Sequence, residues 1–228
     1  MLRKTALTLI LLFGATVARA DVIAVYDYLQ ADVSVAPNGT TLEPATVAAG
    51  FTASDLVLTN ASNTATAFGN HFYHNQWDAG LNTSKYYEAT IGSADDFVLD
   101  DVSFSLENTS GNSTYWLRSS LDGFVGDIAS GAFTALVTDF SVDLTSLGVL
   151  TSPVAFRWYM SAANGSTIAG FSNHQCDPGP LFDAGCGLSD VGTDLIFSGS
   201  SAVPEPGILS LLAMSLLGLG YIRRRKIA

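Results

Sequence analysis

The stretch VSFSL at residues 102–106 alternates apolar and polar side chains, and this alternation decides the fold. In an extended strand, successive side chains point to opposite faces, so Val102, Phe104 and Leu106 would share one buried face. The same period recurs in short stretches at 85–91, 115–121, 140–144, 154–160 and 194–197. The pattern predicts many short β-strands, each with one buried face.

Turn-forming residues separate these stretches, at Asn38-Gly39, 108–112, Asp122-Gly123 and Asn164-Gly165. Gly and Asn adopt the backbone conformations that tight turns need, and they are frequent there for that reason. Many short strands joined by such turns are typical of an all-β protein with antiparallel sheets. We therefore expect a jelly-roll-like β-sandwich over residues 21–202.

The N-terminal residues 1–20 are typical of a secretory signal peptide. Two cations precede an apolar stretch over 6–17, which is too short to span a membrane. Ala18 and Ala20 then form the small-x-small pattern that signal peptidase accepts. We expect cleavage after this pattern, so that the mature chain begins at Asp21.

The C-terminal segment 203–228 reads VPEPGILSLLAMSLLGLGYIRRRKIA and has the composition of a membrane anchor. Residues 207–222 carry no charge, and as a helix they would span roughly 24 Å of a bilayer core of ~30 Å. Snorkelling cations and local thinning cover the difference. The positive-inside rule places the basic tail 223–228 in the cytoplasm and the preceding chain across the membrane. The cations that stop the helix are Arg223, Arg224, Arg225 and Lys226.

The four residues before the anchor form the sequence Val203, Pro204, Glu205 and Pro206. Each proline fixes its own φ and disfavours helix at the preceding residue, so this segment is held extended at the outer membrane surface. The segment, the short apolar span and the terminal arginines together resemble the PEP-CTERM sorting signal of Gram-negative bacteria that make exopolysaccharide. The resemblance implies that an exosortase, a membrane-embedded cysteine transpeptidase, recognises and processes the tail. The catalytic cysteine belongs to that partner, so no catalytic residue is implied in this chain.

The ectodomain also resembles the β-sandwich that often precedes this sorting tail. The resemblance rests on the stretches KYYE at 85–88, FSL at 104–106, WLRSSLDGF at 116–124 and FRWY at 156–159. Together the two resemblances imply a non-enzymatic exported protein, anchored transiently in the inner membrane with its ectodomain in the periplasm. It would end at the cell surface or in the exopolysaccharide matrix. The alternative is a carbohydrate-binding module or a glycoside hydrolase, and a host without an exosortase would make the tail a permanent anchor.

The charge of the ectodomain is strongly negative. Residues 21–203 keep 3 of the 10 basic residues and 20 of the 21 acidic ones, a formal charge of −17. This charge argues against nucleic acid or anionic lipid as a partner. Two of the cations, Arg118 and Arg157, lie within aromatic stretches, and we expect each to pair with Asp122 or another acid. The alternative is an arginine that binds a uronic acid.

Cys176 and Cys186 enclose a short loop, CDPGPLFDAGC, which is rich in turn formers. Two cysteines at this spacing in an exported chain favour a disulfide. The alternative is zinc ligation together with His174, but a lone His-x-Cys falls short of the usual set of zinc ligands.

Two pairs of aspartates flank residues 97–99, and paired aspartates in sandwich loops are a source of calcium ligands. They are Asp95, Asp96, Asp100 and Asp101. The order of an EF-hand is absent, so a solvated strand edge is favoured over a calcium site. The chain also lacks a Glu beside His71 and His74, as a zinc protease would need. We expect no metal and no cofactor.

Five aromatic residues on the expected strands are candidates for a face that stacks sugar rings, and alternation would put roughly half of them in the core. They are Tyr86, Tyr87, Trp116, Trp158 and Tyr159. No Gly-x-Ser-x-Gly occurs in the sequence. With 20 acids in the ectodomain, no pair can be singled out as the two carboxylates of a glycosidase.

Overall fold

The computed structural model describes residues 21–28, 41–60, 71–74, 77–108, 111–134, 137–162, 169–172 and 194–202. The signal peptide over 1–20, the segment 203–228 and both cysteines, Cys176 and Cys186, lie outside these residues, so the expectations for them stay predictions. Within the described ranges, no helix is both long and apolar enough to cross a bilayer.

The described residues form β-strands and two short 3-10 turns, η2 (Ser120–Asp122) and η3 (Thr145–Leu147). The strands are β1 (Asp21–Tyr26), β2 (Thr41–Leu42), β3 (Thr46–Val47), β4 (Phe51–Ala53), β5 (Leu56–Thr59), β6 (His71–His74), β7 (Tyr86–Ser93), β8 (Phe97–Asn108), β9 (Ser113–Ser119), β10 (Ala129–Phe133), β11 (Thr138–Asp143), β12 (Val154–Met160), β13 (Ala169–Ser172) and β14 (Leu195–Ser201).

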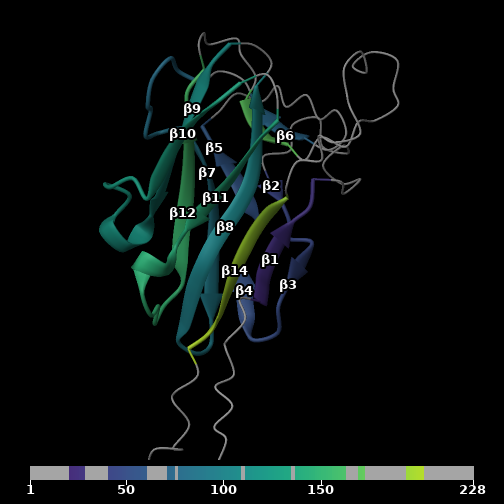
Figure 1. Cartoon of the computed structure of the whole chain (residues 1–228), viewed down its shortest axis with the longest axis vertical. Coiled ribbons are helices and arrows are strands. Elements are labelled where there is room, and N and C mark those ends of the chain that lie inside the picture. The colour runs from purple at the N-terminus through teal and green to yellow at the C-terminus, as the bar shows by residue number, and fades with distance from the viewer. Residues whose placement is uncertain are drawn as a thin grey trace, which may run out of the picture.

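These strands form two antiparallel sheets with one core between them (Figure 1). Sheet A has the order β3-β1-β14-β8-β13-β6. Strand β11 also pairs with β8, along residues 101–106. Sheet B has the order β10-β9-β12-β7-β5-β2, and β4 pairs with β7 beside β5. The chain switches repeatedly between the sheets from β7 to β12. The expected antiparallel β-sandwich is therefore confirmed.

The first and last described strands lie together in sheet A. Asp21 opens β1 and pairs with Gly199 in β14. At the end of β14 the amide of Ala202 donates to the carbonyl of Asp96, at 2.7 Å, in the turn between β7 and β8. Both ends of the sandwich therefore leave it at the same end as that turn, which fixes where the C-terminal segment is attached.

A β-bulge in β8 lets the whole of this long strand contribute to the core. Its inward side chains are Phe97 and Leu99 before the bulge, and Val102, Phe104 and Leu106 after it. The inward-facing positions change from odd to even residue numbers at Asp100. Leu99 pairs with Gly199 of β14 while Asp101 pairs with the adjacent Ser198, which leaves Asp100 as an extra residue. The carbonyl of Asp100 accepts a hydrogen bond of 2.9 Å from the amide of Leu144 instead. The carbonyl of the extra residue is therefore hydrogen-bonded.

Aromatic rings fill much of the core. Phe104 sits at its centre, with ring centroids 5.3 to 6.0 Å from those of Tyr115, Phe140, Trp158 and Phe171. Phe104 packs edge-to-face with Tyr115, Trp158 and Phe171, which come from both sheets, so these ring contacts join the two layers. Two core tryptophans differ in how their ring N–H groups are satisfied. Trp77 Nε1 donates to the carbonyl of Ala169 at 3.0 Å, whereas Trp158 Nε1 has no partner among the described residues.

This difference predicts unequal costs for the same substitution. Trp77→Phe is expected to lower the free energy of unfolding by about 1–2 kcal/mol more than Trp158→Phe, because it also removes a buried hydrogen bond. Trp158→Phe leaves a similar void but removes an N–H that is buried without a partner. Urea unfolding of the two variants measures the difference. An equal or larger cost for Trp158→Phe would contradict the expectation.

Candidate functional site

The outer face of sheet B carries a row of three aromatic residues on neighbouring strands. Trp116 on β9 pairs with Tyr159 on β12. The ring of Tyr159 lies 5.7 Å from that of Tyr86 on β7. Because neighbouring strands lie ~4.8 Å apart, the row is roughly 10 Å long. The side chains of Trp116 and Tyr86 are half-buried, so both rings reach the surface of the sheet.

The structure divides the five aromatic candidates as alternation predicts. Tyr87 and Trp158 point inward and are 0% exposed, and burial raises the pKa of the Tyr87 hydroxyl. Trp116 and Tyr86 point outward. Tyr159 also lies on the outer face, outside the core cluster, yet it is only 1% exposed. Tyr86 contacts its ring, and the guanidinium of Arg118 lies 5.4 Å from its centroid.

A row of charged residues runs beside the aromatic row. Arg118 on β9 pairs across the strands with Arg157 on β12, which in turn pairs with Glu88 on β7. Arg157 Nε donates to the Glu88 carboxylate at 2.6 Å, and Arg118 Nε donates to Asp127 at 2.6 Å. Like charges directly opposite each other repel, so the two carboxylates offset the repulsion between the arginines.

The charge of Arg157 is fixed by its surroundings. Burial disfavours the charged guanidinium, but hydrogen bonds with Glu88 and the hydroxyl of Tyr159 outweigh burial and raise the pKa of Arg157. Its guanidinium carbon lies 4.0 Å from the ring centre of Tyr86 and 3.8 Å from that of Phe124. Arg157 is thus held between two aromatic rings as well as by an acid.

The loop between β9 and β10, residues 120–128, folds onto this face and brings Phe124 with it. The amide of Phe124 donates to the carbonyl of Ser119 at 2.9 Å, and its carbonyl accepts from Arg118 Nη1 at 3.1 Å. Phe124 has a φ of 63°, in the left-handed region that a bulky residue seldom adopts. Such a conformation costs on the order of 1–3 kcal/mol, which the contacts of this loop must offset.

Asp122 does not pair with either arginine. Its carboxylate accepts hydrogen bonds from the amides of Gly126 at 2.8 Å and Val125 at 3.2 Å, and these bonds lower the pKa of Asp122. Of the two alternatives expected, Asp122 or another acid, the structure therefore excludes Asp122 as the partner. The wider expectation of an acidic partner for each arginine is confirmed, with Asp127 and Glu88 in that role.

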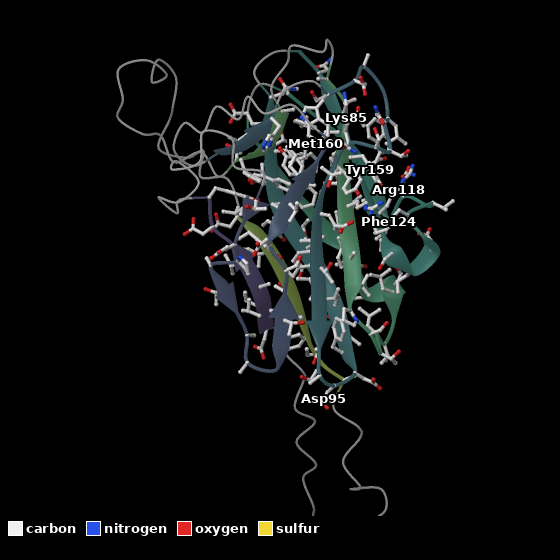
Figure 2. All side chains as sticks on the ribbon, turned by 180° about the vertical axis from the view of Figure 1, so that it is seen from behind. Lys85, Asp95, Arg118, Phe124, Tyr159 and Met160 are labelled. Atoms are coloured by element: carbon white, nitrogen blue, oxygen red, sulfur yellow. The ribbon has the colours of Figure 1, made fainter. Side chains whose placement is uncertain are left out.

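These residues define what we call the aromatic face: Tyr86, Trp116, Phe124 and Tyr159, with Glu88, Arg118, Asp127 and Arg157. Figure 2 shows Arg118, Phe124 and Tyr159 gathered in one region, with Lys85 nearby. Lys85 Nζ lies 3.2 Å from the carboxylate of Asp78. All three cations of the ectodomain are thus paired with an acid on this side of the sandwich.

The outer face of sheet A differs in composition. Strands β8 and β11 present acids and serines there, with Asp101 directly opposite Asp143 and Ser103 opposite Ser141. The Asp143 carboxylate accepts hydrogen bonds from the hydroxyl and amide of Thr145, which lower its pKa. Among the described residues, the outward-facing aromatic and cationic side chains noted above therefore lie on sheet B.

The calcium candidates occupy separate settings. Asp95 and Asp96 are exposed in the turn between β7 and β8, whereas Asp100 is the bulge residue and Asp101 lies on the outer face of sheet A. The described ranges hold no group of three or more His, Cys, Asp or Glu side chains that suits a metal ion. His74 is fully buried, with Nδ1 2.9 Å from the Tyr87 hydroxyl, a setting that suits a structural role.

Comparison with known proteins identifies the C-terminal segment. Residues 202–226 match a family model described as the PEP-CTERM protein-sorting motif. This match confirms the resemblance on which the sorting prediction is based. No curated protein matches the chain.

Among solved structures, the chain is similar to several carbohydrate-binding modules. A mutant family 29 module complexed with mannohexaose is 12% identical, with 67% of this chain and 90% of that chain covered and a TM-score of 0.34. A family 29 module from Piromyces equi is 11% identical, with 71% and 96% covered and a TM-score of 0.29. A family 4 module is 15% identical, with 44% and 65% covered and a TM-score of 0.31, so the chain spans slightly less than two thirds of it. Alignments at this level identify neither a ligand nor a site in this chain.

Proposed function

We propose that this chain is an exported, non-enzymatic surface or matrix protein whose tail is processed by an exosortase. The observation that carries the proposal is the sorting motif at 202–226. The uncharged run over 207–222 and the four cations that follow it support a membrane anchor with its basic end in the cytoplasm.

The N-terminal end of the chain supports the same route. A signal peptide over 1–20 would bring the chain to signal peptidase and leave Asp21 as the first residue. Asp21 is also where β1 begins, so cleavage there would cost the sandwich none of its described pairing. The ectodomain then folds in the periplasm of a Gram-negative bacterium while the tail holds it at the inner membrane. Processing by the exosortase sends it to the cell surface or the exopolysaccharide matrix.

The charges of the aromatic face favour a binding or structural role over catalysis. One carboxylate oxygen of Glu88 and one of Asp127 are each held at 2.6 Å by an arginine. The acids of this face thus position its arginines through charge-assisted hydrogen bonds, which is a structural use of a carboxylate.

The proposal predicts that the fate of the chain depends on the exosortase of its host. We expect the product of the full-length gene to be found at the surface or in the matrix of a strain that has the enzyme, with a mass lower than that of the precursor. In an otherwise identical strain without the exosortase gene, we expect the unprocessed chain in the inner membrane. Cell fractionation and intact-mass spectrometry measure both quantities.

As a control, a plasmid copy of the exosortase in the strain without the gene is expected to restore processing. A copy whose nucleophilic cysteine is replaced by serine is expected not to restore it. The same mass and the same fraction in all strains would refute exosortase processing and leave the tail as a permanent anchor.

A further inference from the structure

We propose that the aromatic face binds an uncharged polysaccharide across strands β9, β12 and β7, and discriminates against polyuronates. The inference rests on the proposed function only for its setting, because export is what brings the face to extracellular polysaccharide. Binding is a property of the folded sandwich and is measured on purified protein, so the two proposals can fail separately.

Trp116 supplies the principal stacking ring. Its side chain is half-buried on the outer face, between Ser130 of β10 and Tyr159 of β12. Among the described residues, its indole makes no ring, cation–π or hydrogen-bond contact. A large ring on a rigid strand, with an unused N–H at its edge, suits a ligand that has an apolar face and polar rims. A pyranose ring has this character, since its C–H groups form a flat face and its hydroxyl groups project from the edge.

The spacing of the two partly exposed rings of the aromatic row, with the buried Tyr159 between them, suits a chain of sugars better than a single one. Trp116 and Tyr86 stand two strands apart, which is roughly 10 Å. This span is comparable to that of a disaccharide. The charged row of Arg118, Arg157 and Glu88 runs parallel to it, so donors and acceptors accompany the rings along the same path.

The pairing of charges selects an uncharged ligand. Hydroxyl groups donate to carboxylate oxygens and accept from guanidinium N–H groups, so a neutral sugar can use both members of the Arg157–Glu88 and Arg118–Asp127 pairs without separating them. A uronate would need an arginine that is released from its present acid. The ectodomain charge of −17 would also repel a polyanion. The uronic-acid alternative raised by the two arginines is therefore disfavoured.

The face is largely fixed before any ligand binds. Arg157 is held between Phe124 and Tyr86, and Arg118 ties residues 120–128 to the sheet through Phe124 and Asp127. Side chains that are already ordered lose little conformational entropy on binding. The unfavourable φ of Phe124 is understandable on this basis, because that conformation places its ring over Arg157.

The aromatic face also lies away from the point of attachment. Ala202, which leads into the C-terminal segment, is bonded to Asp96 in the turn between β7 and β8. Figure 2 shows the neighbouring Asp95 at one end of the molecule, well separated from Arg118, Phe124 and Tyr159. A chain held by its tail would therefore leave the face open to polysaccharide.

Affinity electrophoresis of the full-length chain tests the proposal. The protein is kept in a polyoxyethylene ether detergent, which has no sugar head group to compete. We expect retardation in native gels that contain at least one of hydroxyethylcellulose, glucomannan or dextran, and none with alginate or polygalacturonate. On the polymer that binds, Trp116→Ala is expected to raise Kd by about tenfold or more, as for a lost stacking contact of roughly 1.4 kcal/mol. Ile196→Ala, on the outer face of sheet A, is the matched control and should bind like the native chain.

A second variant tests the selection against charge. Glu88→Gln keeps the shape of the side chain but leaves Arg157 without its ion-pair partner, so we expect this variant to gain retardation by alginate. Thermal melts establish that each variant is folded. The proposal is overturned if no neutral polymer retards the native chain, if alginate binds and neutral polymers do not, or if a folded Trp116→Ala variant binds with unchanged Kd. If the chain binds polysaccharide as expected but no exosortase processes it, the proposed export route is wrong and the binding proposal stands.

Discussion

Gly199→Ala is expected to destabilise the sandwich by about 3 kcal/mol or more, which corresponds to a fall in melting temperature of roughly 6–12 °C. A Cβ atom at this position would lie 2.2 Å from the carbonyl oxygen of Val98 and 3.1 Å from the Cα of Leu99. Both atoms belong to the backbone of β8, so no side-chain rotation relieves the clash. The Cδ1 atom of Ile23, at 2.8 Å, would also have to move.

The position matters because Gly199 faces the bulge of β8. The extra residue there, Asp100, shifts the alternation so that residues on both sides of it face the core. If the added methyl group forced β14 away, the pairing of β8 with β14 would weaken beside this bulge. A shift of the register by one residue would turn the inward side chains of β8 outward. An alternative pairing would therefore expose core side chains to solvent.

Circular dichroism melts of the full-length chain measure this effect. Gly80→Ala is the matched control, because a Cβ at Gly80 meets nothing within 4 Å. The control is expected to change the stability by about 0.5 kcal/mol or less. Equal melting temperatures for the Gly199 and Gly80 variants would show that β8 and β14 do not approach each other as closely as the bulge requires.

The strands themselves could be predicted from alternation because one face of each is buried. The stretch at 154–160 coincides with β12, and that at 115–121 overlaps β9 with a shift of two residues. The bulge at Asp100 could not be predicted from the sequence. An extra residue interrupts the alternation of apolar and polar side chains, and such an interruption is also what the end of a strand produces. Only the pairing with β14 shows that the strand continues through it.

The aromatic face was predictable only in part. Tyr86 and Tyr87 are adjacent in sequence, so alternation requires one of them to point inward and the other outward. Sequence alone does not say which. The ion-pair partners depend on longer-range pairing, because Glu88 and Arg157 are 69 positions apart and meet through the register of β7 and β12.

The roles of Phe124 and Asp127 were not predicted, and Asp122 was only one of the acids that the sequence left open as a partner for the arginines. An Asp just before a Gly tends to accept hydrogen bonds from amides within its own turn. Asp122 does this with the amides of Val125 and Gly126, so its carboxylate is already engaged. The sequence carried that signal, but it did not show that the turn would lay Phe124 over Arg157.

Glu205→Ala is expected to stop maturation and leave the full-length precursor in the inner membrane. Glu205 lies between Pro204 and Pro206 in the matched sorting motif, and the two prolines favour extended backbone around it. An extended segment enters an enzyme cleft with little further loss of entropy, so recognition depends on the side chain that it presents. The substitution leaves the uncharged run 207–222 and its cations unchanged, so insertion into the membrane should proceed as before.

Immunoblots of membrane and matrix fractions, together with intact masses, distinguish a failure of processing from a failure of export. Glu205→Gln tests whether the exosortase recognises the charge or the shape of the Glu205 side chain. We expect this variant also to accumulate precursor, because an exosortase that binds a carboxylate would lose its charge-assisted hydrogen bonds. Ser201→Ala, at the exposed end of β14, is the control for a change just outside the motif and should mature normally. Because Glu205 lies beyond the last described strand, β14, the melting temperature of the sandwich should not change in either variant. Normal maturation of Glu205→Ala would mean that the tail is not read at this residue, and the exosortase would then have to recognise the apolar span or its cations instead.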